Sequence, residues 1–342
     1  MFSRGLTYGD VLIVPKYSDI DSRLDIAPAS YYLGDWRLPI ISAPMDTVSG
    51  PEMVAAMRKN NAYGILHRFG TGTQRRANVR KATYCGNGPI AISIGVKDFN
   101  KTALWLDSLD WEIHSVCIDV AHGDHKLVVD TIKNLIEYQQ ARGLDWYIIA
   151  GNVATEDGFY NLSTAGADAV RVGIGPGSAC TTRETTGIGV PQLTAVLECA
   201  NVKKGWGLNT DIIADGGIQN PGDIAKALAA GADAVMLGKM LAGADESASP
   251  VLQPSPISRA YKTYKGQSLN GSNGLRGAPE GIEGFVKVTG PVKDTLDQLM
   301  HYLRSSMSYV GARNLEEFRE KAEFIEVSPA TYAESATRLG VT

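Results

Sequence analysis

A glycine-rich segment with one cysteine, VGIGPGSACTTRETTGIG at 172–189, carries the residues best suited to chemistry in this chain. Its glycines allow positive backbone angles and let the main chain approach a ligand closely. Clustered amides and carbonyls of such a loop can hold an anion or a cation. Cys180 lies in the middle, beside the hydroxyls of Ser178 and Thr182 and the cation of Arg183. A loop thiol near a positive charge is typical of a reactive nucleophile, and Cys180 is predicted to act as one.

Two glycine-bearing turns further along suit the binding of a phosphorylated sugar. IADGGIQNPGDIAKAL (213–228) ends an apolar run with Asp215, whose carboxylate can accept hydrogen bonds from sugar hydroxyls. Two glycines follow, and then a predicted helix start with Asn220 as N-cap and Pro221 as the first helical residue. VMLGKM (235–240) places Gly238 before another helix start. Glycine-bearing ends of late strands often form the phosphate site of (β/α)₈ barrels, so a phosphate group is predicted to bind here if the fold is such a barrel.

Eight short apolar runs recur through the chain and predict strands that are buried on both faces. They lie at 40–46, 63–69, 91–97, 115–123, 146–153, 169–175, 211–217 and 234–239. Helical patterns separate most of them, at 51–60, 125–143, 156–166, 190–200 and 221–231. This alternation indicates an α/β protein with a parallel (β/α)₈ barrel, whose active site lies at the carboxyl ends of the strands. Cys180, Asp215 and Gly238 all follow strand ends, which favours one shared site.

The remaining segments fit a single barrel domain over residues 1–342. An open doubly wound sheet would need a GxGxxG turn after the first strand, and residues 44–47 lack it. The hexapeptide AGADAV at 165–170 and 230–235 predicts two equivalent turns, with Gly166 and Gly231 in left-handed conformation after a helix. Residues 251–290 are rich in Gly, Asn, Ser and Pro and predict a mobile lid loop at about 266–284. Helices predicted at 291–310 and 314–324 would pack outside the barrel.

The bulk composition excludes several classes of protein. Hydrophobic residues make up 44% and charged residues 20% of the 342 residues, as in ordinary globular proteins. The net charge of −4 demands no basic face, so we expect no nucleic-acid partner. The four cysteines lack CxxC spacing, which favours a reducing compartment and a structural role for Cys85, Cys117 and Cys199. The chain has no signal-peptide pattern and no uncharged apolar stretch of about 18 residues, so we expect a cytoplasmic protein without membrane contact.

Several motifs of the chain resemble those of the IMP dehydrogenase and GMP reductase family. They are GPGSACTTR (175–183), IIADGG (212–217), SAPMDTVS (42–49), AGNVAT (150–155), VMLGKMLAG (235–243), LTYGDVLIVPKYSD (6–19) and PEGIEG (279–284). The resemblance runs from about residue 6 to about residue 327. It implies a (β/α)₈ barrel that forms a homotetramer and whose cysteine thiolate adds to C2 of a purine nucleoside monophosphate. It also implies that hydride passes between C2 and a nicotinamide dinucleotide.

The resemblance assigns roles to the residues at matching positions. Cys180 would be the nucleophile, and Thr182 with Glu280 would assist proton transfer and the loss of ammonia. The nucleotide would be held by Ser42, Ser178, Asp215, Gly217, Gly238, Lys239, Tyr264 and Gly266. The dinucleotide would meet Asp119, Asn152 and Gly173. A monovalent cation such as K⁺, if one binds, would take the backbone carbonyls of Gly173, Gly175 and Cys180.

Two absences favour a reductase over a dehydrogenase within this family. Many dehydrogenases carry a large regulatory insert between early strands, whereas residues 47–62 are all that separates the first two apolar runs here. A dehydrogenase also needs a long flap with an Arg-Tyr pair that activates water, but residues 265–279 contain Arg276 as their one arginine and no tyrosine. A reductase requires no such hydrolysis. We therefore expect NADPH-dependent reductive deamination of GMP to IMP.

Some features favour a different activity. SAPMDTVS, GVPQLTAV (189–196) and PEGIEGFV (279–286) resemble the dehydrogenase more, and Thr182 with a glutamate like Glu280 also occurs in bacterial dehydrogenases. An IMP dehydrogenase that converts IMP to XMP with NAD and lacks the regulatory domain is therefore the first alternative. Lys239 replaces a Ser or Gly common in the family's phosphate loop, and it would add a phosphate contact or accompany a changed substrate such as a deoxynucleotide. A non-catalytic purine-nucleotide-binding barrel also fits the sequence, and a flavin enzyme fits it more remotely.

Overall fold

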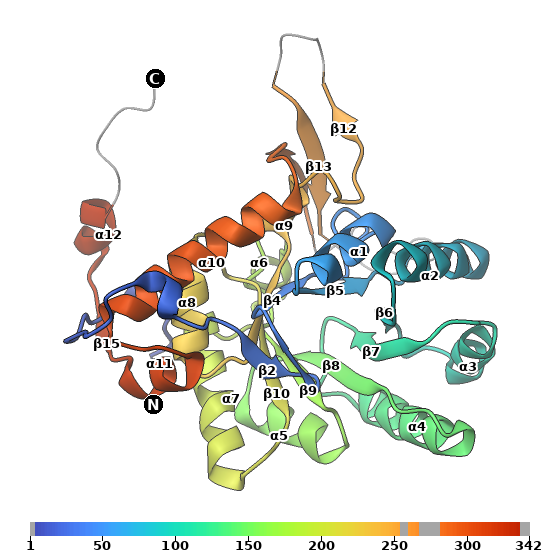
Figure 1. Cartoon of the computed structure of the whole chain (residues 1–342). Helices are drawn as coiled ribbons and strands as arrows, with labels where there is room; N and C mark the ends of the chain where they lie inside the picture. Colours follow the sequence, from blue (N-terminus) through green and yellow to red (C-terminus); the bar gives the residue numbers. More distant parts are fainter. Residues whose placement is uncertain (1–3, 254–258, 267–280, 336–342) are drawn as a thin grey trace.

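The computed structural model describes residues 4–253, 259–266 and 281–335 (Figure 1). Among these residues, eight parallel strands close into a barrel in the order β10-β11-β4-β5-β6-β7-β8-β9. The strands are β4 (Ile40–Ser42), β5 (Tyr63–Leu66), β6 (Ile90–Ile94), β7 (Ile113–Asp119), β8 (Tyr147–Val153), β9 (Ala169–Val172), β10 (Asp211–Asp215) and β11 (Ala234–Leu237). Each falls within or at the edge of one predicted apolar run, so the predicted (β/α)₈ barrel is confirmed.

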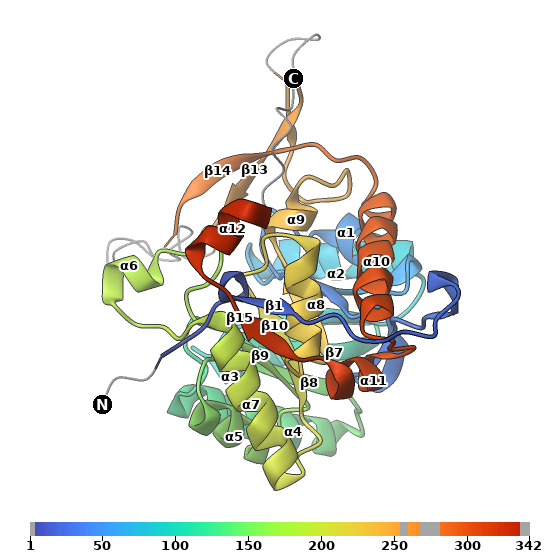
Figure 2. The same ribbon diagram turned by 90° about the vertical axis from the view of Figure 1, so that its left-hand side faces the viewer.

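Helices surround the barrel, and Figures 1 and 2 show them on its outer face. Those that follow barrel strands are α1 (Pro51–Lys59), α2 (Gly72–Gly86), α3 (Phe99–Asp107), α4 (Lys126–Arg142), α5 (Glu156–Thr164), α7 (Gln192–Trp206) and α8 (Pro221–Ala229). One apolar cluster fills the space between strands and helices, and a second fills the barrel interior with side chains such as Ile65, Ile149 and Ile213. The strands are largely apolar because both of their faces are covered, with charged residues such as Arg171 in β9 as exceptions.

The two AGADAV segments form equivalent turns, as predicted. Gly166 and Gly231 have φ of +106° and +109° and follow α5 and α8. In each turn the aspartate accepts a hydrogen bond from a backbone amide of the preceding strand: Asp168 from Ile148 at 2.7 Å and Asp233 from Ile212 at 2.8 Å. The repeated hexapeptide therefore encodes one way of passing from a helix to a strand.

The predicted loop over 251–290 is partly wrong, because the described residues there form an antiparallel sheet. Its strands are β12 (Val251–Leu252), β13 (Tyr261–Lys265) and β14 (Glu283–Lys287). Figure 1 shows β12 and β13 rising away from the barrel. In β13 burial alternates along YKTYK, and the side chains of Lys262 and Tyr264 are the buried ones. With two lysines in five residues, the composition of this segment did not indicate a strand. Of the predicted lid at 266–284, residues 267–280 lie outside the described part.

The chain ends pack against the outside of the barrel. The tail forms α10 (Val292–Tyr309) and α11 (Leu315–Lys321), as predicted, but the second helix stops before Phe324. Instead, β15 (Phe324–Glu326) pairs with β1 (Val11–Ile13), and a short helix α12 (Pro329–Ser335) follows. The hairpin of β2 (Ser30–Tyr32) and β3 (Asp35–Arg37) adds Tyr32 and Leu33 to the interior cluster. No helix in the described part of the chain is long and apolar enough to cross a membrane. The single-domain extent of 1–342 stays a prediction.

Candidate active site

A cavity of about 290 Å³ lies at the carboxyl ends of the barrel strands. Its wall is built by residues at the ends of β4, β5, β7, β8, β9, β10 and β11 or just after them, and by the end of β13. Most of the predicted site residues line it: Asp119, Asn152, Gly173, Gly175, Ser178, Cys180, Thr182, Asp215, Gly217, Gly238, Lys239, Tyr264 and Gly266. The fold thus brings together residues that lie up to 147 positions apart, between Asp119 and Gly266.

The loop after β9 presents Cys180 to this cavity. The thiol is half-buried and its Sγ donates to Thr182 Oγ1 at 3.1 Å, where the short helix α6 (Thr182–Thr186) begins. The loop needs Gly173, whose φ is +144° and where a Cβ would lie 2.1 Å from the Asp215 carbonyl oxygen. Cys180 also forms an antiparallel bridge with Gly281, the described residue next to Glu280. The predicted nucleophile is therefore held between its own loop and the strand that starts after the lid.

The three remaining cysteines have different surroundings. Cys117 and Cys199 are buried, and burial raises the pKa of each thiol to about 12. Both therefore fit the predicted structural role. Cys85 is exposed on α2, and its structural role stays a prediction.

On one side of Cys180, the cavity wall suits a phosphate group. Burial raises the pKa of Tyr264, with the Ser178 side chain and the Lys239 backbone acting in the opposite direction, so its hydroxyl stays protonated. A Cβ on Gly238 would lie 2.7 Å from the Tyr264 hydroxyl, so a larger residue there would displace this hydroxyl. The Lys239 side chain is exposed at the rim and makes no hydrogen bond or ion pair among the described residues. Hydroxyls, backbone and one cation therefore converge here.

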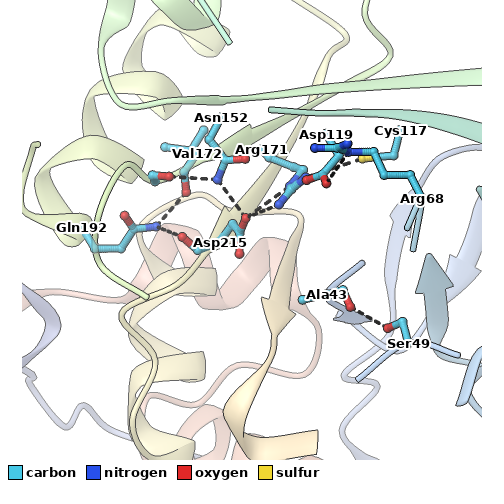
Figure 3. Close-up of polar contacts among 11 residues, drawn as sticks. Ala43, Ser49, Arg68, Cys117, Asp119, Asn152, Arg171, Val172, Gln192 and Asp215 are labelled. Atoms are coloured by element: carbon cyan, nitrogen blue, oxygen red, sulfur yellow. Dashed lines mark hydrogen bonds and ion pairs between the residues drawn. The ribbon is translucent and has the colours of Figure 1, made fainter. Parts of the chain in front are cut away.

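The predicted contact of Ser42 with the nucleotide stays a prediction, and the Ser42 side chain lies away from the described cavity wall. Ser42 is fully buried, and its hydroxyl lies 2.8 Å from that of Ser49. Ser49 in turn donates to the Ala43 carbonyl at 2.6 Å (Figure 3). Ser42 belongs to no part of the described cavity wall, because its side chain points into the packing between β4 and the start of α1. It is replaced at the cavity by its neighbours Ala43 and Met45.

On the other side of Cys180, Asp119 and Asn152 belong to a buried polar network around Arg171 (Figure 3). Arg171 Nη1 donates to Asp119 Oδ1 at 2.6 Å, and Nη2 donates to Asp215 Oδ2 at 2.8 Å. Asn152 Nδ2 donates to the same Asp215 oxygen at 2.8 Å. Burial alone would lower the pKa of Arg171, but Asp215, Cys117 and Asp119 raise it well above the usual value. Arg171 was missed at the sequence level, although a charged residue within the apolar run AVRV was a signal.

The predicted cation site stays a prediction. The Gly173 carbonyl already accepts a hydrogen bond from Asn152 Nδ2 at 2.8 Å. Beside it, Arg183 Nε donates to the Ile174 carbonyl at 3.3 Å and Nη2 to the Val190 carbonyl at 2.5 Å, which ties the loop to its own end. No group of three or more His, Cys, Asp or Glu side chains in the described ranges could hold a metal ion.

Residues 5–338 match the family model described as the IMP dehydrogenase / GMP reductase domain. The chain belongs to this family. Glu280 and Arg276, to which the resemblance gave weight, lie outside the described residues.

Curated relatives within the family carry two names. The GMP reductase of Phytophthora infestans is 38% identical over 343 residues, which cover 94% of this chain and 91% of that protein. The GMP reductase of Ascaris suum is 35% identical, covering 96% and 95%. The inosine-5'-monophosphate dehydrogenase of Methanocaldococcus jannaschii is 43% identical over 267 residues, covering 72% of this chain. The chain spans only 52% of that dehydrogenase, about half its length, whereas it spans nearly all of the reductases.

Proposed function

We propose that this chain is a GMP reductase, which converts GMP to IMP and ammonia with NADPH through a covalent bond between Cys180 and the purine. The observation that carries the chemistry is the half-buried Cys180 thiol at the cavity, 3.1 Å from the Thr182 hydroxyl. The direction rests on the end-to-end match with relatives named GMP reductase and on the short segment at 265–279. We further propose that the enzyme is a cytoplasmic homotetramer.

The first half of the reaction uses residues of this chain. Cys180 gives its proton to the Thr182 hydroxyl, which passes its own proton to the Glu280 carboxylate. Sγ bonds to C2 of the purine while N3 takes up the electron pair of the C2–N3 double bond. Thr182 and Glu280 then deliver a proton to the exocyclic amine, the C2–N bond breaks and ammonia leaves. Glu280 is assigned this role because Gly281, next to it in the chain, bridges Cys180. Addition before elimination divides one difficult displacement into two easier steps.

The second half needs a hydride donor, and small and polar residues on the cavity wall opposite the phosphate side would suit the nicotinamide end of a dinucleotide. Asp119 and Asn152 line it together with the small side chains of Val120 and Ala121, and Gly173 adds none. When bound there, the reduced nicotinamide supplies hydride to C2. The C–S bond then breaks, IMP is released and Cys180 keeps the electron pair as thiolate. Bound K⁺ at Gly173, Gly175 and Cys180 would stiffen the loop.

The other wall would bind the phosphate and ribose of the nucleotide. The hydroxyls of Ser178 and Tyr264 and the backbone at Gly217 and Gly238 would donate to phosphate oxygens. Lys239 adds a positive charge at the rim. Charge-assisted bonds of this kind are about twice as strong as neutral ones. Asp215 would accept from the ribose hydroxyls, and the backbone at Gly266 would face the nucleotide beside Cys180.

IMP dehydrogenase is the second candidate, because the identity with the dehydrogenase of M. jannaschii, 43%, exceeds that with the reductases. The deciding experiment gives the protein GMP with NADPH and, separately, IMP with NAD, while nicotinamide absorbance and ammonia are followed. Oxidation of NADPH with equimolar ammonia is expected. Reduction of NAD without ammonia would replace the proposal with the dehydrogenase, and nucleotide binding without turnover in either mixture would leave a non-catalytic barrel.

Two variants test the assigned residues. Cys180→Ala should abolish turnover and keep nucleotide binding, because the phosphate wall remains intact. Retained turnover would refute covalent chemistry at this thiol. Glu280→Gln should chiefly slow the release of ammonia, and an unchanged rate of release would assign that proton transfer to another group.

A further inference from the structure

We propose that Arg171 is a positioning residue that couples the nucleotide wall of the cavity to the dinucleotide wall, so that a ligand bound on one side tightens binding on the other. This inference rests on the proposed function. Its basis is a single guanidinium that holds two carboxylates from different strands, Asp119 at the end of β7 and Asp215 at the end of β10 (Figure 3).

The centre of the network is buried, whereas Arg68 and Asp215 at its edge are partly exposed. Arg171 is 5% exposed and Asp119 is 2% exposed. Arg68 Nε donates to the second Asp119 oxygen, Oδ2, at 3.2 Å, so two guanidinium groups face the two carboxylates Asp119 and Asp215. Ion pairs in such a setting are weakly screened and are lost at high cost when one partner is removed. Arg171 therefore cannot release one carboxylate without a marked change at the other.

The geometry at Asp215 leaves one oxygen for a ligand. Oδ2 accepts from Arg171 Nη2 at 2.8 Å, from Arg171 Nε at 3.2 Å and from Asn152 Nδ2 at 2.8 Å. None of the hydrogen bonds among the described residues uses Oδ1, and Asp215 lines the cavity. A nucleotide that engages Oδ1 therefore fixes the carboxylate, and through it the guanidinium.

The same guanidinium also positions residues of the dinucleotide wall. Its Nη1 reaches Asp119 Oδ1 at 2.6 Å, and Asn152, which shares the Asp215 oxygen, also donates to the Gly173 carbonyl at 2.8 Å. Asp119, Asn152 and Gly173 are the residues assigned to the dinucleotide. A nucleotide that fixes Asp215 would thus also fix, through Arg171 and Asn152, the three groups that a dinucleotide would meet.

Linked binding can be measured without turnover. In a Cys180→Ala background, calorimetry gives the dissociation constant of GMP with and without saturating NADP⁺. We expect NADP⁺ to tighten GMP by at least about fivefold, the lower end of usual coupling between sites. Arg171→Lys keeps the positive charge but has one ammonium in place of a fork, so it cannot hold both carboxylates in this geometry. It should reduce the coupling to less than about twofold, again measured against the usual range.

Cys117→Ala is the matched control, because Cys117 Sγ lies 3.7 Å from Arg171 Nη1 and its loss disturbs packing at the same place while both ion pairs remain. It should keep the coupling. If Arg171→Lys does not fold by circular dichroism, Asp119→Asn provides the second test, since it retains an acceptor for Arg171 and loses the charge. Its coupling should also fall below about twofold.

Two results would overturn the inference: no coupling in the parent protein, or coupling in Arg171→Lys equal to that of Cys117→Ala. Equal weakening of GMP and NADP⁺ with an unchanged ratio would likewise reduce Arg171 to a structural residue. Failure of the proposed function looks different. If IMP and NAD⁺ bind and GMP does not, the reductase assignment is wrong, and the same linkage measured with IMP and NAD⁺ decides the role of Arg171.

Discussion

Gly266 lies where three segments meet behind the nucleophile, and it cannot carry a side chain there. It follows β13, and its amide donates to the Ile282 carbonyl at 2.9 Å. The Ile282 amide donates to the Ala179 carbonyl at 3.1 Å, one residue before Cys180. A Cβ added at Gly266 would lie 2.4 Å from the Ala179 oxygen and 3.0 Å from the Gly281 Cα. Both are backbone atoms, so no rotamer change relieves the contact.

The size of the effect follows from these distances. Ordinary contact of a Cβ begins at 3.4 Å, so Gly266→Ala must push the Ala179 oxygen away by about 1 Å. A displacement of about 1 Å at a catalytic group costs roughly 100-fold in rate. Weakening the two backbone hydrogen bonds adds about 1–3 kcal/mol of lost stability. We therefore expect kcat of Gly266→Ala to fall roughly 100-fold, since the displaced segment carries Cys180.

The assay is steady-state turnover of GMP with saturating NADPH, with circular dichroism to verify folding. Gly284→Ala is the matched control, because Gly284 lies in the adjacent strand β14 and its added Cβ would meet no atom within 4 Å. The control should retain the parent rate. If Gly266→Ala stays within about threefold of Gly284→Ala, a difference below about 1 kcal/mol, the contact between the base of the lid and the Cys180 loop does not position the thiol.

Three further predictions concern charge. Lys239→Ser should raise KM for GMP about tenfold, or about 1.4 kcal/mol, and leave kcat unchanged. It should also flatten the salt dependence of KM, whereas an unchanged salt dependence would exclude a phosphate contact. Burial and Asp233 raise the pKa of Asp211 to about 6, so the folded state holds this proton more tightly than the unfolded chain, and stability is lost as pH rises from about 4 to 6. Asp211→Asn should therefore increase the free energy of unfolding above pH 6 by up to about 3 kcal/mol and add nothing near pH 4, as judged by denaturant titration; an equal gain at both pH values would contradict this reasoning. Lys262→Met should lower stability by about 3 kcal/mol and reduce Tm, because the buried ammonium donates to three carbonyls, those of Ala244, Asp245 and Ser247; a parent-like Tm would show that different donors replace it.

Local sequence patterns sufficed for the barrel and for most of the site. Continuous apolar runs encode strands that are buried on both faces, and this property requires no knowledge of partners. The AGADAV turns and the Asn220 cap of α8 are likewise local, since each depends on residues within one or two helical turns. The barrel then places the carboxyl ends of all its strands on one rim. Cys180, Asp215 and Gly238 could therefore be assigned to one cavity from the sequence alone.

Long-range contacts decided the rest. The strand β13 could not be predicted from its lysine-containing sequence. Lys262 becomes a core residue only because carbonyls 15 to 18 positions away accept hydrogen bonds from it. Ser42 follows the pattern of a site residue, yet packing turns its hydroxyl towards Ser49. Arg171 reaches Asp119 and Asp215 across 52 and 44 positions of chain, and no spacing rule links them. Sequence therefore determined which strands form and where their ends meet, whereas only the tertiary structure decided which charges and hydroxyls face one another, because that depends on side chains brought together by barrel closure.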